Sequence, residues 1–95
     1  MTQHFDERTP VSIAMSPDEA LVTFEFLSRL IEEREGADLI ALAKHDAEIW
    51  ALDRLLGKLQ RELAQPFHPD YDSLVNAAQR RLSEACGGRW PGSDA

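Results

Sequence analysis

Apolar residues recur at helical spacing along the segment from Pro17 to Glu35, which predicts a first helix. Ser16 can cap this helix, Pro17 suits its first position, and Glu19 completes a capping box. Gly36 predicts its end, because glycine readily adopts the left-handed conformation. The apolar positions cover a wider arc than one neighbouring helix needs: Ala20, Leu21, Phe24, Phe26, Leu27, Leu30 and Ile31. We therefore expect this helix to touch two neighbours, or one neighbour and a second subunit.

A second, long helix is predicted from Ala37 or Asp38 to Ala64, where Pro66 ends it. Its apolar positions change sides partway along. The two groups are Leu39, Ile40, Ala43, Ala47 and Trp50 in the first half, and Leu52, Leu55, Leu56, Leu59 and Leu63 in the second. This pattern predicts a helix that buries different faces at its two ends, or one that bends. Gly57 is the expected place for a bend, because glycine weakens a helix interior.

A third helix is predicted from Pro69 or Asp70 to Ala85 or Cys86, with one narrow apolar stripe. The stripe is typical of a surface helix with one buried side. It comprises Tyr71, Leu74, Val75, Ala78, Leu82 and Ala85. Residues 1–15 are expected to form a loosely ordered arm in which Val11, Ile13 and Met15 alternate with smaller residues. Residues 87–95 are expected to form a flexible tail.

The predicted fold class is all-α, a helical hairpin plus a third helix within a single three-helix domain over residues 16–86. A core of this size seldom stabilises a chain by more than about 3–5 kcal/mol without a staple or an oligomer. The single cysteine, Cys86, excludes an internal disulfide. We therefore expect a dimeric helical bundle, which two helical hairpins commonly form. The alternative is a monomeric three-helix bundle with the second helix at its centre.

The charge of the chain limits its partners. The formal net charge is −7 and the sequence pI about 4.8, so phosphate backbones and anionic lipid surfaces repel it. Much of the excess lies between Pro17 and Glu35, where six acids face two arginines. Glu25, Glu32 and Glu33 are therefore candidate interaction residues for a basic protein partner. The first residues do not resemble a secretory signal, and no apolar run reaches the length of a membrane span, so a cytoplasmic protein is expected.

Asp46 fits its surroundings least well, because Leu42, Ala43, Ile49 and Trp50 lie three and four positions away. An unpaired buried carboxylate is costly. One interpretation places Asp46 at the margin of the buried face, or in an ion pair with Arg29 or Arg34. The other makes it a carboxylate that recognises a ligand or partner, with Trp50 beside it.

Catalytic and metal chemistry find little support. His45 and Glu48 are three residues apart and can share a helix face, but they reverse the Glu-x-x-His order of di-iron bundles and occur only once. We expect no metal and no cofactor. Cys86 is expected to be a buried or half-buried thiol without a catalytic motif. Trp90, beside proline in the tail, either anchors in a partner's pocket or packs back on its own domain.

Two functions remain open at this point. The first is a small acidic helical module for protein–protein interaction, an adaptor, chaperone, neutralising or regulatory protein that self-associates. The second is a small ligand- or metal-binding bundle or enzyme that uses Asp46, His45 and Glu48. The enzyme hypothesis predicts a cavity on which these residues converge. The interaction hypothesis predicts an apolar patch or seam without a deep polar pocket.

Overall fold

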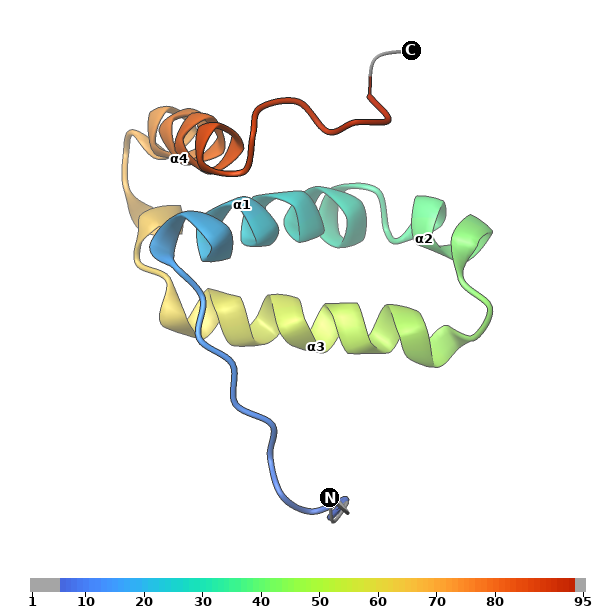
Figure 1. The fold of residues 1–95 in the computed structure, drawn as a ribbon. Helices are drawn as coiled ribbons and strands as arrows, with labels where there is room; N and C mark the ends of the chain where they lie inside the picture. The colour runs from blue at the N-terminus through green and yellow to red at the C-terminus, as the bar shows by residue number, and fades with distance from the viewer. Residues whose placement is uncertain (1–5, 94–95) are drawn as a thin grey trace, which may run out of the picture.

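A computed structural model of the chain describes residues 6–93, and within them it contains four α-helices and no strand (Figure 1). The all-α class predicted from the sequence is therefore confirmed. The described part of the chain has four α-helices where the sequence predicted three, because the second predicted helix is divided into a short α2 and a long α3. The elements in chain order are α1 Pro17–Ser28, the π-helical turn η1 Arg29–Glu33, α2 Ala37–Leu42, α3 Asp46–Glu62, the 3-10 turn η2 Gln65–Phe67 and α4 Tyr71–Ala85.

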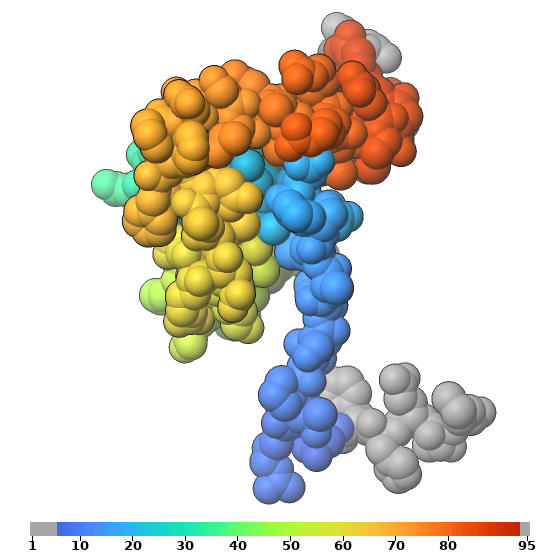
Figure 2. Space-filling model, turned by 90° about the vertical axis from the view of Figure 1, so that its left-hand side faces the viewer, coloured from blue at the N-terminus to red at the C-terminus, as the bar shows by residue number. Residues whose placement is uncertain are grey.

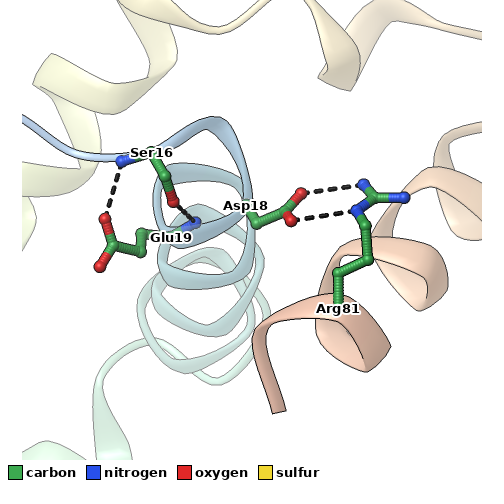
Figure 3. A network of polar contacts seen from close by, with 4 residues as sticks. All are labelled: Ser16, Asp18, Glu19 and Arg81. Carbon is green, nitrogen blue, oxygen red and sulfur yellow. Dashed lines mark hydrogen bonds and ion pairs between the residues drawn. The ribbon is translucent and has the colours of Figure 1, made fainter. Parts of the chain in front are cut away.

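The start of α1 is fixed by the predicted capping box. The backbone N–H of Glu19 donates to Ser16 Oγ at 3.1 Å, and the backbone N–H of Ser16 donates to Glu19 Oε1 at 2.7 Å (Figure 3). Two of the N–H groups that a helix start leaves without a partner are thereby satisfied. At its far end the helix continues through η1. It stops where Glu35 and Gly36 both adopt positive φ, 53° and 71°, as Gly36 predicted.

α1 is the central helix of the fold, with α3 along one side and α4 across the other (Figure 1). One apolar cluster joins α1 to α3, and a second joins α1 to α4. Their buried members are Phe24, Leu27, Leu56 and Leu59 in the first, and Leu21, Val75 and Ala78 in the second. These two neighbours in the same chain account for much of the wide apolar arc of the first helix, whereas Phe26 keeps 52% of its surface exposed. The central position that the monomeric alternative gave to the second helix is wrong, because α1 lies between α3 and α4.

The single long helix predicted over residues 37–64 is also wrong, because the chain breaks between Ala43 and His45. Both residues have extended backbones, with ψ of 142° and 143°. The predicted bend at Gly57 does not occur, since α3 runs through it without interruption. The two apolar groups of this segment differ in burial. α2 has no buried residue, and Ile40, Ala47 and Trp50 of the first group are exposed, whereas Leu56 and Leu59 of the second group are buried on α3.

α4 packs on α1 through its predicted stripe and through an aromatic contact. Tyr71 and Phe24 meet edge to face with ring centroids 6.5 Å apart. Cys86, at the end of α4, is exposed rather than buried or half-buried as expected. No helix among residues 6–93 combines the length and apolar character that a membrane crossing requires.

The arm, residues 6–15, carries no helix or strand, and it leaves the body beside the end of α3 (Figures 1 and 2). The chain as a whole is open for its size. Its accessible surface is 8147 Å², whereas a folded monomer of 10.7 kDa exposes about 5,500 Å². Its radius of gyration is 15.8 Å, against about 12 Å for a compact domain of this length.

Candidate functional site

His45 and Glu48 form a second capping box, which starts α3. His45 Nδ1 accepts the backbone N–H of Ala47 at 2.9 Å. The Glu48 carboxylate accepts the backbone N–H groups of Lys44 at 2.8 Å and His45 at 2.7 Å. Both side chains are therefore engaged by the backbone at the break between α2 and α3. Their local role is to start a helix. This role accounts for the spacing of His45 and Glu48, so no catalytic role is needed to explain it.

Asp46 occupies the first turn of α3 and is exposed. A carboxylate there is stabilised by the positive end of the helix dipole, so its apolar neighbours in sequence do not bury it. The ion pair expected with Arg29 or Arg34 is not formed. Arg29 instead pairs with Glu25 at 3.2 Å, and Arg34 binds Asp38. Asp46 thus lies at the margin of the helix, as one of the sequence interpretations proposed.

The geometry does not bring these residues onto a cavity. A small hollow of about 140 Å³ lies between α2 and α3, and neither His45 nor Asp46 lines it. Its lining is Leu39, Leu42, Ala43, Glu48, Ile49 and Leu52. Among residues 6–93, no group of three histidine, cysteine or acidic side chains is arranged to hold a metal ion. The predicted convergence of His45, Asp46 and Glu48 on a ligand is not observed.

The acidic residues of the first helix have different surroundings. Glu25 is half-buried and pairs with Arg29, while Glu32 accepts a hydrogen bond from Ser28 Oγ at 2.7 Å. Glu33 is exposed, and no hydrogen bond or ion pair is found for it within the described residues. The freely available acidic surface on this helix is therefore at its C-terminal end, around Glu32 and Glu33, rather than along its whole length.

Sequence reasoning missed the ion pair between Asp18 on α1 and Arg81 on α4. Arg81 donates from Nε at 3.0 Å and from Nη2 at 2.8 Å to the two carboxylate oxygens (Figure 3). These hydrogen bonds hold the pKa of the Asp18 carboxyl below its ordinary value, against the opposing effect of burial. The two residues are 63 positions apart, and nothing in the local sequence pattern connects them. The pair could be found only from the packing of α1 on α4.

Tyr71 lies where the two apolar clusters meet, and it packs against both. Burial raises the pKa of its phenol, and the negative charges of Glu25 and Asp72 raise it further. The hydroxyl therefore stays protonated under ordinary conditions, and Tyr71 acts as a packing residue, as the sequence indicated.

Large apolar side chains are exposed on α2, at the start of α3 and in the tail. Ile40, Leu42 and Trp50 retain 66%, 81% and 66% of their surface. The name α2–α3 patch is a collective name for these three exposed residues, of which Leu42 also lines the hollow between the two helices. Trp90 retains 79%, so it does not pack back on the domain. Of the residues singled out in the sequence, Trp50 and Trp90 are thus available to a partner.

A larger groove lies between the arm and α3, with a volume of about 570 Å³. Figure 2 shows the arm standing off from the body beside this end of α3. We call this groove the arm groove. Its lining is Val11, Ser12, Ile13, Met15, Ala20, Leu55, Lys58, Leu59 and Glu62. Lys58 and Glu62 are its only charged residues, and neither forms an ion pair within the described chain.

Comparisons with protein-family models, with curated proteins and with solved structures found no match to this chain. The functional argument therefore depends on the surfaces described above.

Proposed function

We propose that the chain is a small acidic helical module for protein–protein interaction, of the adaptor, chaperone, neutralising or regulatory kind, and that it self-associates. The observation that carries this proposal is the apolar surface left open by one copy. Single exposed apolar residues are ordinary on protein surfaces. Here several large apolar side chains of the described residues each keep more than half of their surface exposed: Val11, Ile13, Phe26, Ile40, Leu42, Trp50, Phe67 and Trp90.

Two surfaces with different chemistry support this role. The α2–α3 patch offers aliphatic and indole groups, the residue types that act as anchors in interfaces. The end of the first helix offers Glu32 and Glu33, in a chain of net charge −7. An acidic surface speeds the approach of a basic protein and selects against acidic ones. The lone exposed Cys86 favours a reducing compartment, so the proposed location is the cytoplasm.

Self-association is tested by light scattering coupled to size-exclusion chromatography over a range of concentrations. The expected mass approaches twice 10.7 kDa as the concentration rises. A mass that stays at one chain up to hundreds of micromolar would contradict self-association.

Acidic recognition is tested with a lysine-rich helical peptide as the basic probe. The double variant Glu32→Lys/Glu33→Lys should bind this peptide more weakly, with a smaller salt dependence, because two acids become two bases. The matched control is Asp72→Lys/Glu84→Lys on α4, which changes the net charge equally. Equal loss in both variants would show that only the total charge matters.

A further inference from the structure

We propose that the arm groove is the seam of a two-fold dimer, in which the C-terminal halves of the two α3 helices lie antiparallel and the occupant of each groove is a second copy of this chain. This inference rests on the self-association proposed above and assigns it to one surface. Its argument starts from the two charged residues of the groove, whose signs are opposite.

Lys58 and Glu62 are one helical turn apart on α3, so both project from the same side of the helix. In a two-fold dimer, residue i of one copy faces residue j of the other, and j faces i. An axis that passes between these two residues, perpendicular to α3, sets each Lys58 opposite the Glu62 of the second copy. A parallel arrangement would set lysine against lysine and glutamate against glutamate. The charge pattern is therefore complementary to itself in the antiparallel arrangement.

The apolar part of the groove supplies the area for the same contact. Val11 and Ile13 retain 91% and 75% of their surface, although they stand beside Leu55 and Leu59 in the groove lining. In the antiparallel dimer the arm of each copy lies along α3 of the other, and its apolar side chains are covered there.

The α2–α3 patch is a weaker candidate for the same seam. The only charged residue that lines its adjoining hollow is Glu48, whose carboxylate already accepts two backbone N–H groups. The lining of that hollow therefore has no pair of opposite charges to match against a second copy of itself. It is left for a different partner.

Charge reversal in the arm groove tests the assignment through the dissociation constant of the dimer, measured by analytical ultracentrifugation. Lys58→Glu and Glu62→Lys should each weaken dimerisation about tenfold or more, because each replaces two attractions across the axis with two repulsions. The double variant Lys58→Glu/Glu62→Lys should restore the affinity to within about threefold of the original, because the signs match again.

Three further variants separate the apolar contact from the charges and control for the changes of charge. Ile13→Asp should make the chain monomeric without unfolding it, since the isoleucine is exposed in one copy. Arg80→Glu and Glu84→Lys make the same changes of charge at exposed positions on α4, outside the groove, and they should leave the dissociation constant unchanged.

The outcomes distinguish this inference from the proposal on which it rests. A wild-type chain that is monomeric at every concentration overturns both. A wild-type dimer that survives Lys58→Glu, Glu62→Lys and Ile13→Asp overturns the arm groove alone. Dissociation by Leu42→Asp instead would locate the seam at the α2–α3 patch, and would likewise overturn the assignment.

Discussion

At the scale of single residues, Leu56 and Leu42 carry the same side chain in opposite environments. Leu56 retains 3% of its surface in the cluster between α1 and α3, and Leu42 retains 81% at the end of α2. Leu56→Ala should lower the free energy of unfolding by about 2–5 kcal/mol, because it removes buried methyl groups and leaves a cavity. Leu42→Ala should change it by less than about 0.5 kcal/mol. Urea denaturation of both variants at one protein concentration checks the prediction, and equal losses would contradict the described core.

The ion pair between Asp18 and Arg81 should make stability depend on pH in a defined direction. The folded pKa of Asp18 is lowered by the hydrogen bonds from Arg81, so the pair stabilises the fold above the unfolded pKa. This contribution is lost as pH falls through the lowered folded value. Asp18→Asn should therefore be less stable than the wild type at pH 7, and the difference should shrink from about pH 4 downward.

The measurement for this pair is urea denaturation of wild type and Asp18→Asn at several pH values between 3 and 7. Asp53→Asn is the control, because Asp53 lies on α3 and forms no ion pair within the described residues. A stability difference for Asp18→Asn that stays constant down to pH 3 would show that the carboxylate charge is not the cause.

At the scale of elements, the break between α2 and α3 depends on a histidine acting as a helix cap. His45→Ala removes the acceptor for the Ala47 N–H and should lower the free energy of unfolding by about 1 kcal/mol. His45→Asn keeps an acceptor at the cap and should retain most of that stability. Thermal or urea unfolding at one pH compares the two variants. Equal stability of His45→Ala and wild type would show that the cap does not stabilise α3.

The sequence predicts elements well where local chemistry decides them. The serine, proline and glutamate that start α1 satisfy its first N–H groups without help from the rest of the chain, and Gly36 supplies the conformation that ends it. The stripe on α4 correctly predicted a helix with one buried side, which carries Val75 and Ala78. These features depend on residues within a few positions of one another, so periodicity and capping rules suffice.

The break at residues 43–45 was missed because its cap is unusual. His45 accepts a backbone N–H through Nδ1, a role more often filled by serine, threonine, aspartate or asparagine. The signal was the pair His45 and Glu48 at capping-box spacing, which was interpreted as possible ligand chemistry instead. For Asp46, the apolar neighbours in sequence suggested burial. Because α3 begins at Asp46, its carboxylate is exposed to solvent and lies near the positive end of the helix dipole. This environment follows from the break before α3 and cannot be predicted without it.

At the scale of the whole molecule, contacts between segments far apart in the sequence determine features that the sequence pattern did not predict. The pairing of Asp18 with Arg81 and the central position of α1 both follow from how α4 crosses α1. The arm groove has the same origin, since it combines residues 11–15 with the second half of α3. Helical periodicity indicated that the apolar surface was extensive. It did not indicate that this surface would be divided between a covered core and open faces.

If the open faces are covered by a second copy, folding must depend on concentration. For a dimer whose unfolded chains are separate, each tenfold rise in concentration adds about 1.4 kcal/mol per dimer to the apparent stability. The urea midpoint of the wild type should therefore rise between 1 and 100 μM, a range of about two such steps. The midpoint of Lys58→Glu should move much less, because its copies meet with like charges. A wild-type midpoint that does not change with concentration would mean that one copy folds with its arm groove uncovered.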